Sequence, residues 1–213
     1  MSVPIGENML NYTIICGSHR MESQSTKVSK AIQLFLSQTP DAGEINLIDL
    51  RGNPLPFWEE SVWQNDPKWE KYWKPYSEKL KKADGIVVVS PEWNGMATPG
   101  LKNFFLFCKN DDVGHKPGMI VSVSSSIGGS YPVAELRMSS YKNNRLCYIP
   151  DHVIVRNAEK VLNNPEKPDS PDDERIAKRL KYSLGVLREY SLALRNLRNS
   201  PNINFGKEFA NGM

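Results

Sequence analysis

The chain has 213 residues, of which 39% are hydrophobic and 24% charged, and this is enough to bury a sizeable core in one α/β domain. Its net charge of +3 comes from 27 basic and 24 acidic residues, a balance too mild to indicate a nucleic-acid partner. No apolar run approaches the roughly 18 residues of a membrane span, and residues 1–10 lack the pattern of a secretory signal. We therefore expect a cytoplasmic protein that binds neither nucleic acid nor membrane.

The cysteines and histidines are few and lie far apart, without the CxxC or HxxxH spacing of a metal site. They are Cys16, Cys108, Cys147, His19, His115 and His152. An odd and sparse set of cysteines is typical of buried thiols in a reducing compartment. We therefore expect no disulfide framework and no metal, and we interpret the histidines as ordinary surface or loop residues.

Short β-rich runs alternate with helical patterns about five times along the chain. The predicted strands cover 12–16, 44–50, 85–90 and 119–123, and a fifth is shared by 146–149 and 153–155. Apolar residues at helical spacing predict helices over 28–36, 66–83, 101–108, 133–141 and 176–197. Ser23 or Ser25 is well placed to cap the first of them. This order predicts an α/β doubly wound, five-stranded parallel sheet with helices on both faces.

The expected organisation is one domain over 11–198 between a mobile N-terminus, 1–10, and a mobile tail, 199–213. A polar segment with three prolines, 165–173, precedes the long last helix. That helix carries many basic residues, but acidic residues dilute them and its apolar stripe explains it as a solvated helix. The tryptophans of 58–73 predict either a small satellite core under a long loop, which we favour, or a subunit interface or pocket wall.

In such a sheet ligands bind beyond the carboxyl ends of the strands, near the point where the strand order reverses. The loop after the first strand, 17–26, supplies hydroxyls, free amides at a helix N-terminus and the guanidinium of Arg20. These groups suit a phosphate, because the helix end carries unpaired N–H groups and partial positive charge. Neither GxGxxG nor a P-loop is present, and an ordinary capped helix start fits the spacing equally well.

Two further strand ends carry unusual loops. In 91–100 the turn formers Pro91 and Asn94-Gly95 let backbone groups face a flat polar ring, while Trp93 packs either on that ring or over the core. Small residues and hydroxyls in 124–130 permit the close approach of a ligand. Taken singly, each loop is explained as well or better by a simple connection between strand and helix.

Together, however, the loops resemble the NADPH-dependent FMN reductases, a group that includes chromate reductases, quinone reductases and azoreductases. The similarity runs from about residue 12 to residue 155, and its most specific part is the stretch 91–103, where order, spacing and strand context agree. The matching segments are Gly17-Ser18-x-Arg20-x-x-Ser23, Asp49-Leu50-Arg51 with Pro54-Leu55-Pro56, Pro91-Glu92-Trp93-Asn94-Gly95 with Pro99-Gly100-Leu101-Lys102-Asn103, and Gly128-Gly129 with Leu136-Arg137.

The resemblance implies a flavodoxin-like fold that binds FMN without a covalent bond. The implied phosphate ligands are Ser18, Arg20, Ser23 and Ser25, with Thr26 a weaker candidate. The implied neighbours of the isoalloxazine are Pro91, Glu92, Trp93, Asn94 and Gly95, and those that close over the ring or its ribityl chain are Ser124, Ser125, Gly128 and Gly129. Trp93 stands where many relatives have tyrosine, Ser25 where many have asparagine, and the chain beyond Val155 matches less clearly.

The resemblance also implies a reaction. Hydride would pass from NADPH or NADH to flavin N5, and the reduced flavin would pass electrons to a quinone, azo compound, metal oxyanion or free flavin. No catalytic side chain is assigned, and Glu92 is interpreted as an exposed turn carboxylate rather than a proton donor. Relatives are commonly dimers or tetramers, so a homodimer or homotetramer is expected.

Two other functions compete with this one. A flavodoxin-type electron carrier is usually strongly acidic, which disfavours it for a chain of charge +3. A cofactor-free interaction protein on the same fold would have a damaged first loop, and here that loop is intact.

Overall fold

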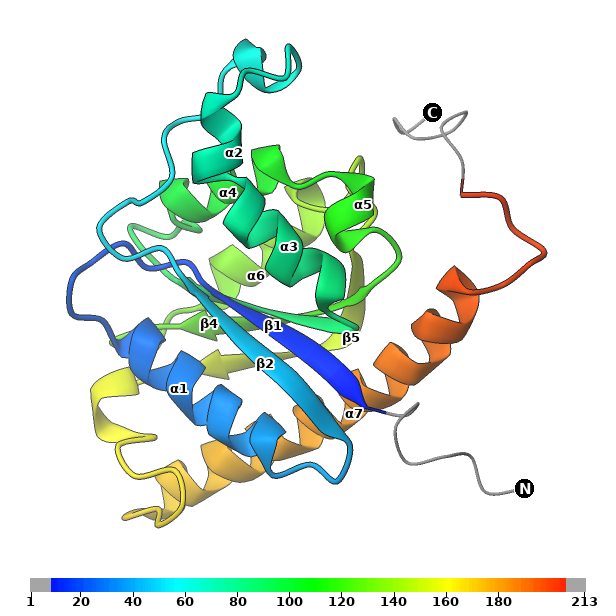
Figure 1. The fold of residues 1–213 in the computed structure, drawn as a ribbon. Coiled ribbons are helices and arrows are strands. Elements are labelled where there is room, and N and C mark those ends of the chain that lie inside the picture. Colours follow the sequence, from blue (N-terminus) through cyan, green and yellow to red (C-terminus); the bar gives the residue numbers. More distant parts are fainter. Residues whose placement is uncertain (1–8, 206–213) are drawn as a thin grey trace, which may run out of the picture.

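Five parallel strands form one sheet, in the order β2-β1-β3-β4-β5 (Figure 1). The strands are β1 (Leu10–Cys16), β2 (Ala42–Asp49), β3 (Gly85–Pro91), β4 (Pro117–Val123) and β5 (Cys147–Val155). The computed structural model describes residues 9–205, so most of the predicted mobile N-terminus and part of the predicted tail lie outside the described residues. Strands β3 and β4 are buried along their whole length, which explains their continuous apolar sequences.

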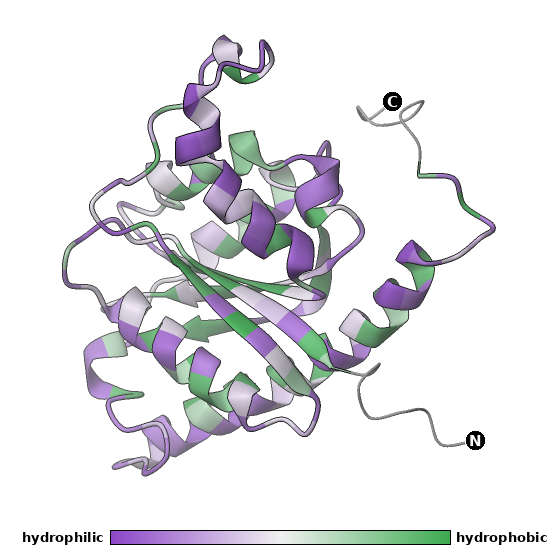
Figure 2. Ribbon diagram, viewed as in Figure 1, coloured by the Kyte–Doolittle hydropathy of each residue, from purple (hydrophilic) through white to green (hydrophobic). Residues whose placement is uncertain are grey.

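Helices cover both faces of this sheet, as predicted, and their outer surfaces are hydrophilic (Figure 2). One face packs against α1 (Gln24–Ser37) and α7 (Pro171–Arg198). The other face packs against the helices α2 (Lys68–Tyr72), α3 (Lys74–Lys82), α4 (Pro99–Phe107), α5 (Asn110–Val113) and α6 (Ser130–Ser139). Two short 3-10 turns, η1 (Glu60–Val62) and η2 (Ala158–Lys160), complete the order. Both core clusters share the sheet, so the chain folds as a three-layer α/β unit.

Several predicted boundaries are wrong. The single helix expected over 66–83 is two helices, α2 and α3, which meet at Trp73 where Pro75 occupies the first turn of α3. Proline cannot donate a helix hydrogen bond, so a new helix begins there. The two apolar runs near residue 150 form one continuous strand, β5, whose pairing with β4 shifts register between Gly118 and Ile120.

Helix limits also differ from the prediction at two other places. Helix α6 ends at Ser139, so Tyr141 lies outside it. The polar linker ends at Ser170, whose hydroxyl accepts a hydrogen bond from Asp173 N and caps α7.

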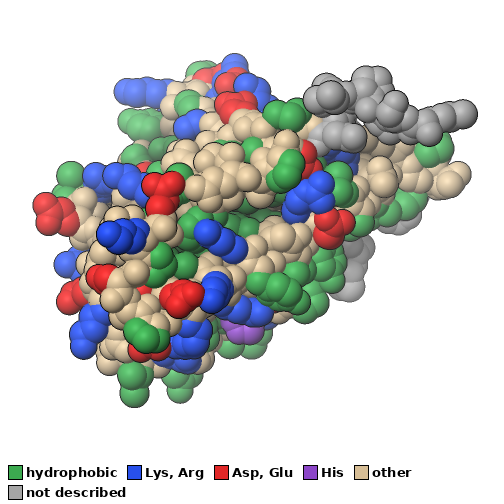
Figure 3. Space-filling view, turned by 90° about the horizontal axis from the view of Figure 1, so that it is seen from below, with side chains coloured by type: hydrophobic (Ala, Val, Ile, Leu, Met, Phe, Trp, Pro, Cys, Tyr) green, Lys and Arg blue, Asp and Glu red, His purple; other side chains and the backbone are tan. Residues whose placement is uncertain are grey.

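The basic side chains of α7 find partners within the protein. Their ion pairs are Arg175–Asp172, Lys178–Glu174, Arg179–Asp151, Arg188–Asp41, Arg188–Glu189, Arg195–Asp84 and Arg198–Asp84. Figure 3 shows the molecule from below relative to Figure 1, and on this surface acidic and basic side chains are interspersed. These pairs support the interpretation that α7 needs no polyanionic partner to explain its charge.

The tryptophans of 58–73 divide into two groups. Trp69 and Trp73 are buried and pack on Phe107 within the main core on that face of the sheet, so the expectation of a separate satellite core is wrong for them. Trp63 does not belong to that core, because it is 73% exposed and contacts only the edge of Trp58 among the described rings. Within residues 9–205 no helix combines the length and the apolar character that crossing a membrane requires.

Candidate functional site at the carboxyl edge of the sheet

Three loops meet where the carboxyl ends of β1, β3 and β4 lie side by side. We call them loop 1 (17–23), loop 2 (92–98) and loop 3 (124–129). Each begins by extending the sheet: Gly17 N donates to Val89 O at 2.8 Å, Glu92 N to Val123 O at 2.9 Å, and Ser124 N to Val155 O at 2.9 Å. The strand order reverses at β1 and β3, so loops 1 and 2 flank the topological switch point.

Loop 1 leads into α1, and Ser23 caps that helix. The backbone of Ser23 is extended, and its Oγ accepts a hydrogen bond from Thr26 N at 3.1 Å. Its Oγ also lies 3.0 Å from Thr26 Oγ1, so these two hydroxyls partly satisfy each other. The cap is therefore Ser23 and not Ser25, which lies inside the first turn and is 1% exposed.

Loop 1 and the first residue of α1 also hold buried polar atoms that the protein does not satisfy. Ser18 Oγ, His19 Nε2 and Gln24 Oε1 are buried and have no hydrogen-bond partner among the described residues. Most buried polar atoms are hydrogen-bonded, so three exceptions at the start of one helix indicate a place that meets a ligand. Arg20 is exposed and forms no ion pair within residues 9–205. A hydroxyl donor, a guanidinium and helix N-terminal amides fit a phosphate group.

Loop 2 is a tight hairpin turn around Asn94 and Gly95. Trp93 N donates to Met96 O at 3.0 Å, and Met96 N donates to Trp93 O at 2.9 Å. Both central residues have positive φ, 49° for Asn94 and 72° for Gly95, as a type I′ turn requires. The geometry of the turn thus explains the Asn-Gly pair. The tip of the turn is exposed at the edge of the sheet.

Trp93 joins loop 2 to loop 1. Its ring meets the His19 imidazole edge to face, with centroids 4.4 Å apart and planes inclined by 60°. Trp93 is only partly buried, so it does not simply cover the core. His19 is a loop residue, as expected, but its Nε2 is buried.

Glu92 joins loop 2 to loop 3. Its carboxylate accepts a hydrogen bond from Gly129 N and is half-buried, so the interpretation of an exposed turn carboxylate is wrong. Gly129 has φ of 102°, and a Cβ there would collide with Ile154 Cγ2. Only glycine fits that backbone without strain. The two glycines of the loop therefore allow β4, loop 3 and β5 to approach closely.

Two residues to which the sequence assigned no role hold neighbouring loops in place. Arg156, just after β5, donates through Nε to Ile127 O at 2.6 Å and to Gly128 O at 3.0 Å. Asn103 on α4 accepts from Trp58 N at 2.8 Å and donates to Pro56 O at 2.9 Å. An amide among the apolar positions of a helix is a signal that could have revealed Asn103, because a buried amide needs partners.

Glu135 on α6 supports the end of loop 2. It accepts from Ala97 N at 2.7 Å and pairs with Lys102 Nζ at 2.6 Å. Partial burial acts to raise the pKa of Glu135, but the hydrogen bonds from Lys102 and from the Ala97 amide outweigh it. The pKa therefore lies below its usual value of 4.5.

We expect this contact to make stability depend on pH. A carboxyl whose pKa is lowered by folding stabilises the protein above its unfolded pKa, and this contribution disappears as pH falls through the folded pKa. At about pH 7, Glu135→Gln should lower the free energy of unfolding by roughly 1 kcal/mol, since Lys102 is half exposed. The difference in the free energy of unfolding between the two proteins should shrink steadily as pH falls below 4.5, the usual pKa of a glutamate. Urea unfolding across this range measures it, with Glu44→Gln as control; a difference that is constant with pH would contradict the assignment.

The predicted cofactor residues thus lie together at one edge of the sheet, with Ser25 and Thr26 inside the first turn of α1. Among the described residues no group of three or more His, Cys, Asp or Glu side chains forms a metal site. Two surface hollows lie elsewhere, one lined by residues between 165 and 181 and the other by residues between 115 and 148. Neither lining includes a predicted cofactor residue. The case for a ligand at the carboxyl edge therefore rests on the three converging loops and on the unsatisfied polar atoms of loop 1.

Known proteins share this sequence pattern and this fold. Residues 10–160 match the family described as NADPH-dependent FMN reductase. A quinone reductase of Pseudomonas putida is 28% identical over 127 residues, which cover 54% of this chain and 61% of that protein. The chain thus matches less than two thirds of that relative's length.

Solved structures agree on the fold. One is the flavoenzyme NAD(P)H:(acceptor) oxidoreductase FerB of Paracoccus denitrificans, with a TM-score of 0.64 and 18% identity over 87% of this chain and 98% of that one. Another is the NAD(P)H:quinone oxidoreductase of Methanothermobacter marburgensis, with a TM-score of 0.55 and 14% identity over 89% of this chain and 99% of that one. The flavodoxin-like fold expected from the sequence is confirmed.

Proposed function

Because the chain belongs to the NADPH-dependent FMN reductase family, we propose that it binds FMN at the carboxyl edge and passes electrons from NADPH or NADH to a small acceptor. The observation that carries this proposal is the set of unsatisfied buried polar atoms in loop 1, at the N-terminus of α1 and beside loops 2 and 3. When bound, FMN supplies an acceptor for a hydride and a donor of its electrons.

The residues of this chain bind and orient the cofactor. Ser18, Arg20 and the first amides of α1 hold the phosphate, because they combine a hydroxyl donor, a fixed positive charge and a helix end. Ser23 shapes the helix start as its cap, with Ser25 and Thr26 in the turn behind it. The Trp93–His19 contact fixes the position of loop 2 relative to loop 1, and the Glu92–Gly129 hydrogen bond fixes loop 3 relative to loop 2.

The segment from Pro91 to Gly95 would hold the isoalloxazine of FMN. The small residues of loop 3 would close over the ring or its ribityl chain; they are Ser124, Ser125, Gly128 and Gly129. No side chain is assigned as catalytic. The proposed acceptors are a quinone, an azo compound, a metal oxyanion or free flavin; the quinone is supported by the Pseudomonas putida relative. A homodimer or homotetramer and a cytoplasmic location complete the proposal.

A spectrum tests this function directly. We expect the purified protein, or the protein mixed with FMN, to show flavin bands near ~375 and ~450 nm that bleach when NADPH or NADH is added without oxygen. Addition of a soluble quinone should then restore the bands. Bands that persist with both nicotinamides would favour the flavodoxin-type carrier, and a protein that takes up no FMN would favour the cofactor-free interaction protein.

A further inference from the structure

A hollow of about 540 Å³ lies at the opposite edge of the sheet from the three loops. Its lining comes from His115, which precedes β4, from the end of α6, and from 141–148, which lead into β5. In a parallel sheet the starts of neighbouring strands share the edge opposite to their carboxyl ends. The hollow is therefore remote from the proposed FMN site, and its volume falls within the range of about 300–1,000 Å³ that is common for small-ligand sites.

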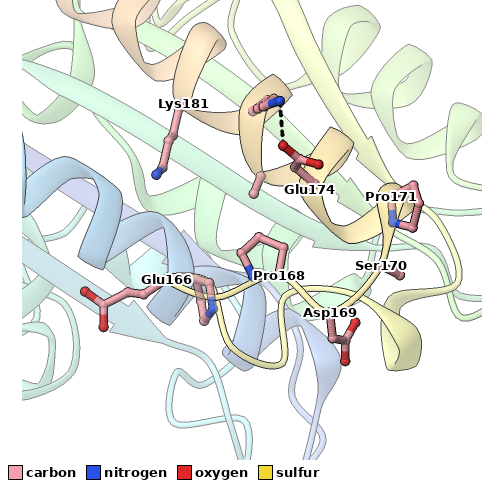
Figure 4. Close-up of a pocket in the computed structure, with 10 residues that line it drawn as sticks. Glu166, Pro168, Asp169, Ser170, Pro171, Glu174 and Lys181 are labelled. Carbon is pink, nitrogen blue, oxygen red and sulfur yellow. Dashed lines mark ion pairs between the residues drawn. The ribbon is translucent and has the colours of Figure 1, made fainter.

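The charges around this hollow have one sign. Its described lining contains Arg137, Lys142 and Arg145 and no aspartate or glutamate. The other hollow, between the proline-containing linker and α7, differs: Glu166, Asp169 and Glu174 face it together with lysines, and Glu174 pairs with Lys178 at 2.6 Å (Figure 4). Mixed charges favour no particular ion there, whereas three cations around one hollow favour an anion.

No carboxylate among the described residues pairs with these cations, and the guanidinium of Arg137 is held in place. Arg137 donates through Nη2 to Ile149 O at 2.7 Å and to Pro150 O at 2.9 Å, contacts that orient its guanidinium without cancelling its charge. Lys142 and Arg145 form no ion pair within residues 9–205. The backbone of Arg145 is fixed, since its N–H donates to Tyr141 O at 2.7 Å and its carbonyl accepts from His115 N at 2.8 Å.

His115 also lines this hollow. Burial lowers the pKa of His115, and the nearby Arg145 and Arg198 lower it further, so the imidazole stays neutral near pH 7. Its Nε2 is buried and has no hydrogen-bond partner among the described residues. A neutral histidine with a free nitrogen beside unpaired cations suits a hydrogen bond to a ligand oxygen.

We propose that this hollow binds a small organic anion that carries several phosphate charges, such as a nucleoside polyphosphate. Lys142 and Arg145 contact the phosphate oxygens, because charge-assisted hydrogen bonds to phosphate are the strong interaction available to them. Tyr141, 44% exposed on the rim, offers a flat apolar surface to the rest of the ligand. This inference does not rest on the proposed FMN chemistry.

Calorimetric titration of the full chain with inorganic pyrophosphate and with ATP tests the site. We expect saturable binding of one equivalent at about millimolar affinity or better, and weaker binding at high salt. Adenosine should bind at least about tenfold more weakly than ATP, and comparison of ATP with pyrophosphate separates recognition of the organic part from recognition of the phosphates.

The variant Lys142→Gln/Arg145→Asn should weaken pyrophosphate binding by about ten- to a hundredfold. Asparagine suits position 145 because φ there is 60°. The control Lys30→Gln/Lys167→Gln removes the same charge from exposed positions elsewhere and should bind normally, and both variants should bind FMN as before. Lys142→Gln alone, at an exposed position, provides the test if the double variant unfolds.

Three results would overturn the proposal. They are the absence of saturable binding for both phosphate probes, an equal loss of affinity in the control variant, and adenosine binding as tight as ATP binding. If the phosphates fail to bind and the double variant instead changes the sedimentation of the protein, the hollow belongs to an interface between protein chains.

Discussion

Arg20→Ala is expected to weaken FMN binding by about ten- to a hundredfold. Hydrogen bonds to charged groups have a typical net value of about 1.5–3 kcal/mol, which corresponds to that range of affinity. Arg20 has no ion pair within residues 9–205, so its removal leaves no carboxylate unpaired and the loss reports the ligand contact. Titration of the apoprotein with FMN, followed by the quenching of flavin fluorescence, measures the change.

Two further variants make this result specific. Arg175→Ala removes another exposed arginine, which lies on α7 far along the chain from loop 1, and should leave FMN affinity unchanged. Arg20→Lys keeps the charge but not the paired donors of the guanidinium, so it should recover only part of the affinity. Unchanged affinity in Arg20→Ala would show that the phosphate lies in another loop.

Asp84→Ala is expected to lower the free energy of unfolding by about 3–5 kcal/mol, the cost of breaking a buried ion pair by removing one partner. Asp84 is 8% exposed and accepts from Arg195 Nε at 2.8 Å, from Arg198 Nη2 at 3.2 Å and from Asn11 N at 3.0 Å. Its loss leaves two arginines of α7 without this carboxylate and releases the end of α7 from the start of β3.

Urea unfolding measures this cost, and Glu70→Ala serves as the control. Glu70 pairs with Lys74 on the surface at 2.6 Å, and an exposed ion pair of this kind contributes little to stability. The FMN affinity of folded Asp84→Ala should stay normal, because Asp84 lies at the opposite edge of the sheet from loops 1 to 3. Equal destabilisation by the two variants would mean that the Asp84 cluster does not anchor α7.

The amino-acid sequence by itself determined the α/β class, the five strands and the family. Strands β3 and β4 are buried on both faces, so their apolar runs are continuous and easily recognised. The turn at Asn94 and Gly95 is also a local property, since the left-handed backbone that this pair favours is the one a type I′ turn needs. Because parallel strands end at a common edge, the three loops were predicted to meet without any knowledge of side-chain contacts.

Only the tertiary structure decided which side chains connect those loops and what the remaining charges do. The Trp93–His19 contact, the Glu92–Gly129 hydrogen bond and the Asn103 contacts join residues far apart in the chain. Local periodicity carries no information about such pairs. It also cannot separate the buried Trp73 from the exposed Trp63, because Trp63 follows a short 3-10 turn and Trp73 lies where two helices meet, so regular helical spacing assigns neither side chain to a face. The hollow near His115 is lined by positive charges alone for the same reason, because folding brings Arg137, Lys142 and Arg145 together around it.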